Sequence, residues 1–132
     1  MGFQFDRLSG EVIAAAVQVH KVLGPGFIEN VYEQALKLEL NKRKIRFESQ
    51  KQIQVFYAGQ TVGTHVLDLL VEDQLIVELK AVAGLEDVHF AQVRSYLSAT
   101  GAKVGLLMNF NSPKLTIKRI VRNFEQSNCS NT

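Results

Sequence analysis

The stretch LDLLVEDQLIVELK, residues 67–80, is the part of the sequence that decides the fold. Two apolar runs flank a polar tip at residues 72–74, which is typical of a β-hairpin. Apolar strands rarely carry an acid in their interior, because burying an unpaired charge is costly. Asp68 nevertheless interrupts the first run, and Glu78 and Lys80 interrupt the second. We therefore expect two adjacent strands that hold a small group of charges.

Side-chain alternation along a strand predicts how these charges are arranged. Glu78 and Lys80 are two residues apart and project from one face. If the polar tip is a three-residue loop, Val71 pairs with Leu75, and Asp68 lies directly opposite Glu78. Two carboxylates that close can share a hard cation, while the lysine steers a water and steadies charge on a phosphate. The alternative is a cross-strand salt bridge between Lys80 and Asp68 or Glu78. If these three residues were the only observation, we would favour the salt bridge.

Apolar periodicity outward from the hairpin predicts the remaining elements. We expect helices over residues 9–23 (capped by Ser9), 28–42 and 85–100, and strands over residues 52–57, 61–71, 75–80, 103–109 and 114–122. The last segment also fits a helix. A helix between the third and fourth strands permits a parallel crossover. The expected fold class is therefore α/β, a sandwich with a mixed central β-sheet flanked by helices.

Length and composition narrow the class of protein. The chain of 132 residues fits one domain, expected over residues 1–124 and followed by a disordered polar tail over residues 125–132. A single cysteine, Cys129, excludes a disulfide scaffold and a cysteine-based zinc cluster. The N-terminus lacks a signal-peptide pattern, and no apolar stretch approaches the ~20 residues of a membrane span. We expect a cytoplasmic protein with no membrane partner.

The charges are unevenly distributed, although the net charge is only +2. Basic residues predominate in segments 37–51 and 114–122, and acidic residues predominate in segment 68–87. An acidic centre between basic segments suits a metal site with a phosphate-binding rim. Solvated surface faces are the simpler explanation when this pattern is taken alone.

Two predicted helices carry further candidate residues. Glu29 and Tyr32 are three apart on one face of the second helix, and Glu29 could deliver a third acid to a metal. Its alternative role is to stabilise the positive end of the helix macrodipole. In the third helix His89, Gln92 and Tyr96 form a polar ridge on one face. This ridge either contacts phosphate and water beside the metal or is an ordinary polar face with a half-buried tyrosine.

Several of these motifs together resemble a known family. HKVLGPGFIENVYEQAL, residues 20–36, resembles the signature of the GxxExxY family, which belongs to the PDDEXK nuclease superfamily with its restriction-endonuclease-like fold. The spacing of Asp68, Glu78 and Lys80 matches the core motif of that superfamily. The ridge of the third helix resembles the glutamine–tyrosine motif of its RecB-like branch. The resemblance covers residues 8–122.

The resemblance implies a role for each candidate residue. Asp68 and Glu78 are expected to be catalytic metal ligands, together with the backbone carbonyl of Leu79, for Mg²⁺ or Mn²⁺. Lys80 is expected to orient or activate the attacking water. Glu29 is expected to act as an additional acidic ligand or as a base beside the ligands. The expected supporting residues are Gln92, Tyr96, Tyr32 and His89, whereas His20 is expected to pack at a helix end.

The resemblance implies an enzyme, a metal-dependent nuclease that hydrolyses phosphodiester bonds in nucleic acid. DNA is the favoured substrate, and the protein could form a homodimer. The alternative is a catalytically silent PDDEXK-fold module that binds nucleic acid or a protein partner. Its motivation is the short chain, which has no insertion with which to grip DNA. A third hypothesis is a metal-binding accessory subunit of a defence or repair complex.

Overall fold

The computed structural model describes residues 2–122 and confirms the predicted order of the elements. The helices and strands are α1 (Gly2–Leu23), α2 (Glu29–Lys42), β1 (Phe47–Tyr57), β2 (Gln60–Val71), β3 (Leu75–Lys80), α3 (Asp87–Thr100), β4 (Val104–Asn109) and β5 (Thr116–Val121). The predicted polar tail at residues 125–132 lies outside the described residues. None of the helices described is both long and apolar enough to cross a membrane.

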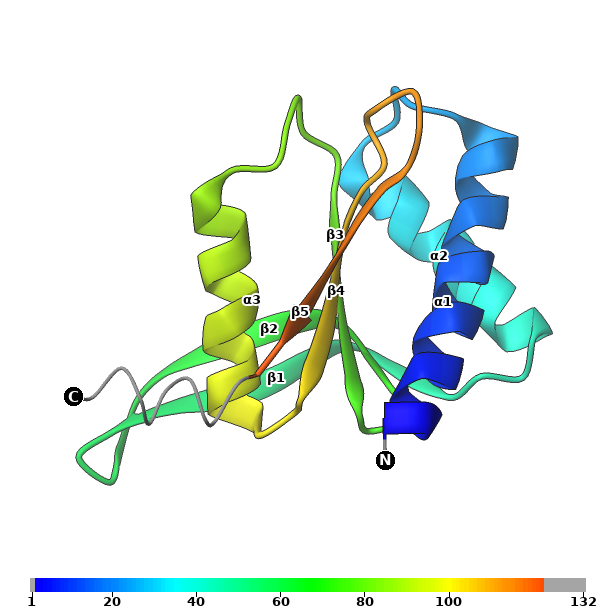
Figure 1. Ribbon diagram of the computed structural model, residues 1–132. Coiled ribbons are helices and arrows are strands. Elements are labelled where there is room, and N and C mark those ends of the chain that lie inside the picture. The colour runs from blue at the N-terminus through cyan, green and yellow to red at the C-terminus, as the bar shows by residue number, and fades with distance from the viewer. Residues whose placement is uncertain (1, 123–132) are drawn as a thin grey trace.

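The strands form one mixed sheet in the order β1-β2-β3-β4-β5. Only β3 and β4 run parallel, and the other neighbours are antiparallel. The helix α3 connects the two parallel strands, as the crossover prediction requires. Figure 1 shows α1 and α2 against one face of the sheet, α3 against the other, and the β1–β2 hairpin extending past α3. The predicted α/β sandwich is confirmed.

The start of α1 differs from the prediction. The helix begins at Gly2, so Ser9 lies in its interior and does not cap it. Ser9 is only 2% exposed, and its Oγ has no hydrogen-bond partner within the described part of the chain. The spacing of Ser9 from Val12 and Ala16, three and seven residues, places all of them on one helical face. Ser9 therefore extends the buried stripe that the prediction took to begin after it.

The two edge strands show where β1 begins and which of the two alternatives holds for residues 114–122. β1 begins at Phe47, five residues before the predicted start, because its polar first half still pairs residue by residue with β2. An edge strand tolerates this polarity, since one of its sides remains open to solvent. β5 is a strand, which excludes the helical alternative for residues 114–122.

Two apolar clusters hold the layers together, and β2 contributes to both. Leu69 packs in the cluster beneath α1 and α2, whereas Leu67 packs in the cluster beneath α3. Asp68 therefore lies where β2 passes from one cluster to the other. In β3, Val77 and Leu79 belong to the α1–α2 cluster. The predicted alternation is confirmed, so Glu78 projects toward the layer of α3.

The close approach of α3 to β4 depends on Gly105. A Cβ atom added at Gly105 would lie 2.7 Å from Cγ1 of Val93, which is shorter than a van der Waals contact. Both residues are buried, so the helix and the strand have no solvent-filled space into which to shift. This packing fixes the distance of α3 from the sheet and thereby the position of every side chain on its inner face.

We predict that Gly105→Ala lowers the free energy of unfolding by about 1–3 kcal/mol, because the added methyl group overpacks the contact with Val93. Urea unfolding followed by circular dichroism measures the change. The matched control is Gly10→Ala in α1, where an added Cβ meets no atom within 4 Å. This control should be more stable than wild type by about 0.5–1 kcal/mol, because alanine favours the helix. Equal stability of Gly105→Ala and wild type would contradict the prediction.

Candidate active site

The hairpin between β2 and β3 brings the first two candidate acids together. The predicted register is confirmed, since Val71 pairs with Leu75. Continuing this register places Asp68 opposite Glu78, one step beyond the last regular backbone pair. The sequence position of the polar tip alone therefore determines that these two carboxyl groups are neighbours.

Asp68 and Glu78 are held by reciprocal hydrogen bonds to the backbone of the opposite strand. The N–H of Asp68 donates to Oε1 of Glu78 at 2.9 Å, and the N–H of Leu79 donates to Oδ2 of Asp68 at 2.9 Å. Oδ1 of Asp68 and Oε2 of Glu78 accept no hydrogen bond from residues 7–122, and neither is a fully buried atom without a partner. One oxygen of each carboxylate is thus fixed, and the other remains accessible to a ligand.

Burial and nearby negative charges make both carboxyl groups weak acids. Desolvation raises the pKa of Glu78 to about 8, and the negative charge of Asp68 adds to the effect. Desolvation also raises the pKa of Asp68 to about 6, with the charges of Glu33 and Glu29 adding to it. The backbone N–H of Leu79 lowers the pKa of Asp68 but does not offset its burial. At neutral pH the pair therefore retains a proton that a bound cation would displace.

Lys80 is directed toward α3. Its Nζ lies 3.5 Å from Oε1 of Gln92, and no ion pair joins it to Asp68 or Glu78 in the described residues. The salt-bridge alternative raised by the sequence is therefore absent from the structure. Gln92, a neutral acceptor, holds the ammonium group beside the carboxylates and leaves its remaining N–H donors available.

Tyr96 and His65 stack beside the carboxylates. Their ring centroids are 4.2 Å apart with an interplanar angle of 26°. Tyr96 is 7% exposed, and its burial together with the charges of Glu78 and Asp68 raises its pKa to about 12. Its hydroxyl group therefore stays protonated and can donate a hydrogen bond at neutral pH. The sequence offered His65 no partner, because a ring contact between β2 and α3 requires the folded chain.

The negative charges of two acids of α2 reach Asp68, and only Glu29 was predicted from the sequence. Glu29 is exposed at the first turn, and its charge reaches both carboxyl groups of the hairpin. Glu33, one turn later, is 6% exposed, and both of its carboxylate oxygens accept hydrogen bonds from Nε2 of Gln50, at 3.1 and 2.9 Å. The four-residue spacing from Glu29 was the signal that could have revealed Glu33.

Gln50 occupies an unusual place in β1. Its φ angle is +52°, and the β1–β2 register places it opposite Asp68, where backbone pairing is interrupted. A left-handed conformation is strained for a non-glycine residue and persists only where surrounding contacts enforce it. The two hydrogen bonds to the buried Glu33 supply such contacts. The backbone strain at Gln50 therefore lies in β1, next to Asp68 of the candidate active site.

Tyr32 stabilises the loop that precedes α2. It is fully buried and stacks on Phe110 with ring centroids 4.7 Å apart. Its hydroxyl group donates to the carbonyl of Gly24 at 2.6 Å and accepts from the N–H of Phe27 at 3.1 Å. These bonds fix the turn that leads directly into Glu29. The structure thus places Tyr32 in the core, where it orders the helix start that carries the acid.

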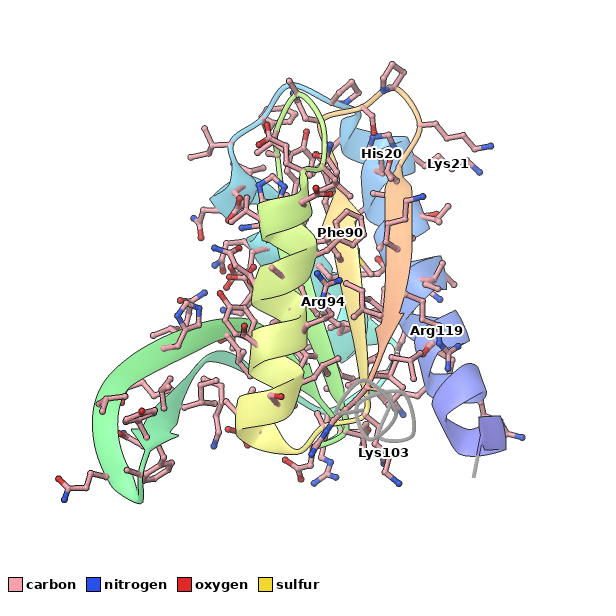
Figure 2. All side chains as sticks on the ribbon, turned by 60° about the vertical axis from the view of Figure 1, so that its left-hand side comes forward. His20, Lys21, Phe90, Arg94, Lys103 and Arg119 are labelled. Atoms are coloured by element: carbon pink, nitrogen blue, oxygen red, sulfur yellow. The ribbon has the colours of Figure 1, made fainter. Side chains whose placement is uncertain are left out.

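Two histidines have local structural contacts. Nδ1 of His89 accepts the N–H of Glu86 at 2.9 Å as part of the cap of α3. His20, labelled near the end of α1 in Figure 2, is buried, and its Nε2 lies 3.0 Å from the carbonyl oxygen of Ser112. Its ring also packs against Phe110. The prediction that His20 packs at a helix end agrees with these contacts.

The chemistry of the donors fits a hard divalent cation. Asp68 and Glu78 present carboxylate oxygens, which Mg²⁺ and Mn²⁺ prefer. No group of three acidic, histidine or cysteine side chains gathers into a metal cluster within the described residues. Mg²⁺ is usually held by one or two carboxylates, with water and substrate phosphate completing its coordination. Two neighbouring carboxylates with accessible oxygens meet that requirement.

We predict that the metal-free protein becomes less stable as the pH rises from about 5 to about 8. Both carboxyl groups have folded-state pKa values above their ordinary values, so the folded protein keeps protons that the unfolded chain releases over this range. Their contribution to stability is complete at low pH and is lost as the pH rises through the folded-state pKa values. Thermal unfolding in EDTA at a series of pH values measures the effect.

Glu78→Gln isolates the part of this pH dependence that belongs to the pair. The amide cannot ionise but can still accept the hydrogen bond from Asp68, so the fall in melting temperature should be shallower than in wild type. Glu11→Gln, an exposed substitution on α1, should follow the wild-type curve. Parallel curves for Glu78→Gln and wild type would show that burial does not raise the pKa of Glu78.

Two solved structures share the fold of this chain. The crystal structure of SSO0001 is similar with a TM-score of 0.58 and 16% identity, over 75% of this chain and 52% of that one. The chain thus spans about half the length of SSO0001. An alkaline exonuclease (LHK-Exo) from Laribacter hongkongensis is similar with a TM-score of 0.54 and 14% identity, over 87% of this chain and 71% of that one. At these identities the structures show the shared fold.

A search of curated proteins gives no match. The family model described as the PD-(D/E)XK nuclease superfamily matches residues 6–120, which include both hairpin acids and Lys80. Members of this superfamily generally use divalent metal ions. The chain belongs to the PD-(D/E)XK nuclease superfamily.

Proposed function

We propose that the protein is a Mg²⁺- or Mn²⁺-dependent nuclease that hydrolyses phosphodiester bonds, with DNA as the favoured substrate. The observation that carries this proposal is the pair of Asp68 and Glu78, a half-buried and a buried carboxyl group that form no ion pair with a cationic side chain within the described residues. Such a pair destabilises the metal-free fold, because burial and repulsion both oppose its ionisation. A bound divalent cation would relieve that cost.

In this proposal Asp68 and Glu78 hold the ion, with the backbone carbonyl of Leu79 as a further ligand. When bound, the ion supplies positive charge that polarises a phosphodiester and lowers the pKa of a bound water. Glu29 lies at the exposed start of α2, and its negative charge acts on both Asp68 and Glu78. It acts as an additional acid for the ion or as a base for the water.

The remaining side chains act on the substrate. Lys80, held near Gln92 and free of ion pairs to the acids, orients the attacking water and balances negative charge on the phosphate. Tyr96 keeps its proton at neutral pH and donates a hydrogen bond to a phosphate oxygen. The water oxygen bonds to phosphorus, the phosphorus–oxygen ester bond breaks, and the leaving oxygen takes a proton.

Within the superfamily we further place this chain in the GxxExxY family and the RecB-like branch. Gly26, Glu29 and Tyr32 support the first assignment, and the polar ridge of α3 supports the second.

A catalytically silent module remains the competing hypothesis. It gives no reason for the uncompensated pair of acids, since a module without an ion would be more stable with neutral side chains there.

We predict that wild-type protein with Mg²⁺ or Mn²⁺ cleaves labelled DNA and that Glu78→Gln lowers the rate at least about 100-fold, since oriented charge at such a site contributes rate factors of that size. Gel analysis of single- and double-stranded DNA, linear and circular, and of RNA measures cleavage and identifies the substrate. EDTA should abolish it. Lys80→Met should reduce the rate while leaving metal binding intact.

Glu11→Gln is the matched control for Glu78→Gln, because it makes the same chemical change at an exposed position on the other side of the sheet. It should cleave at the wild-type rate. Cleavage that survives Glu78→Gln would exclude the assigned site. A folded wild-type protein that cleaves none of the substrates with either metal would overturn the nuclease proposal in favour of the silent module.

A further inference from the structure

A groove lies between the β1–β2 hairpin and α3. It has a volume of about 640 Å³, and its walls include Val55 and Phe56 from β1 and Arg94, Ser95 and Ser98 from α3. This volume is within the range of ~300–1,000 Å³ that is typical of ligand sites. Figure 2 shows the hairpin curving past α3, the helix on which Arg94 is labelled.

A β-bulge lies at the aromatic wall of the groove. Successive side chains of a regular strand point to opposite faces, yet Val55 and Phe56 both line the groove. The β1–β2 register shifts between these two residues, because Val62 of β2 is an extra residue without a partner in β1, and such a bulge increases the local twist of the hairpin beside α3. Phe56 remains 63% exposed there. Its ring is therefore available for a flat aromatic group to pack against.

The helix α3 carries residues of both the groove and the candidate active site. Gln92, Ser95 and Ala99 lie on one side of the helix, because they are separated by three and four residues. Gln92 contacts Lys80 beside the carboxylates, whereas Ser95 and Ala99 line the groove. The stacked rings of His65 and Tyr96 join the hairpin to the helix along the same course. The groove and the candidate active site therefore lie against the same helix.

The chemistry of the walls suits one class of ligand. Arg94 is a cation, two serine hydroxyl groups can donate hydrogen bonds, and the residues that line the groove include no acid. Phosphate groups complement this charge, and a base can stack on the ring of Phe56. Bases of a duplex are stacked on each other and cannot lie flat on a side chain. A single strand exposes them.

We propose that this groove binds single-stranded nucleic acid and guides it to the Asp68–Glu78 site. The inference rests on the proposed function and adds the strandedness of the substrate to it. Phe56 supplies the stacking surface, and Arg94 contacts a phosphate. A duplex is bound only where its end has opened into single strands.

Binding without cleavage tests the proposal. Fluorescence anisotropy in EDTA measures the affinity of the full chain for labelled oligothymidylate and for its duplex with oligoadenylate. Wild type should bind the single strand more tightly. Phe56→Ala should weaken that binding by about 5- to 150-fold, the range expected for the loss of one aromatic stacking contact. Arg94→Gln should reduce the slope of log affinity against log salt by about 0.7, the value for one contact to a single-strand phosphate.

Matched controls separate the groove from the rest of the surface. Tyr57→Ala removes a neighbouring aromatic ring that is 76% exposed and does not line the groove. Lys21→Gln removes an exposed charge on α1, across the sheet from α3 (Figure 2). Both should bind as wild type does. Melting temperatures verify that each variant is folded. Both alanine variants should fold, because Phe56 and Tyr57 are exposed and contribute little to the core.

The outcomes separate this inference from the nuclease proposal. If Phe56→Ala and Arg94→Gln bind the single strand as wild type does, or if duplex binds as tightly as single strand, the groove inference is wrong while cleavage can still establish the nuclease. If wild type cleaves no substrate but binds single strands through Phe56 and Arg94, the nuclease proposal is wrong and the groove inference stands.

Discussion

The juxtaposition of the half-buried Asp68 and the buried Glu78 is the constraint on which the arrangement of the site depends. The two groups lie where regular pairing of β2 and β3 ends, and each carboxylate bonds to a backbone N–H of the opposite strand. These bonds hold two carboxyl groups together where ionising both is costly, and a hairpin without a ligand has no reason to carry that cost. The surrounding elements can be understood by what each adds to this pair.

The two layers of helices contribute opposite properties to the pair. From one side, α2 brings the further negative charges of Glu29 and Glu33, which favour protonation or cation binding at the hairpin. From the other side, α3 brings the neutral groups Gln92, which accepts a hydrogen bond from Lys80, and Tyr96, whose hydroxyl group keeps its proton at neutral pH. Acidic groups on one side of the carboxylates suit a cation, and neutral polar groups on the other side suit a phosphate.

Much of this could be predicted, because local rules determine it. The polar tip fixes the pairing of Val71 with Leu75, and alternation then separates Glu78 from its apolar neighbours. Contacts between distant segments could not be predicted in this way. The strained Gln50 depends on Glu33 of another element, and the cap assigned to Ser9 failed because a buried serine resembles a helix start when only the following residues are considered.

The decisive measurement is isothermal titration calorimetry of Mg²⁺ binding, repeated in buffers of different ionisation enthalpy. At neutral pH we expect binding to release protons, because burial keeps the pKa of Glu78 at about 8 and the ion must displace its proton. Glu78→Gln should remove both the binding and the release, and Glu11→Gln should change neither. Mg²⁺ binding that releases no protons and persists in Glu78→Gln would show that the ion site lies elsewhere.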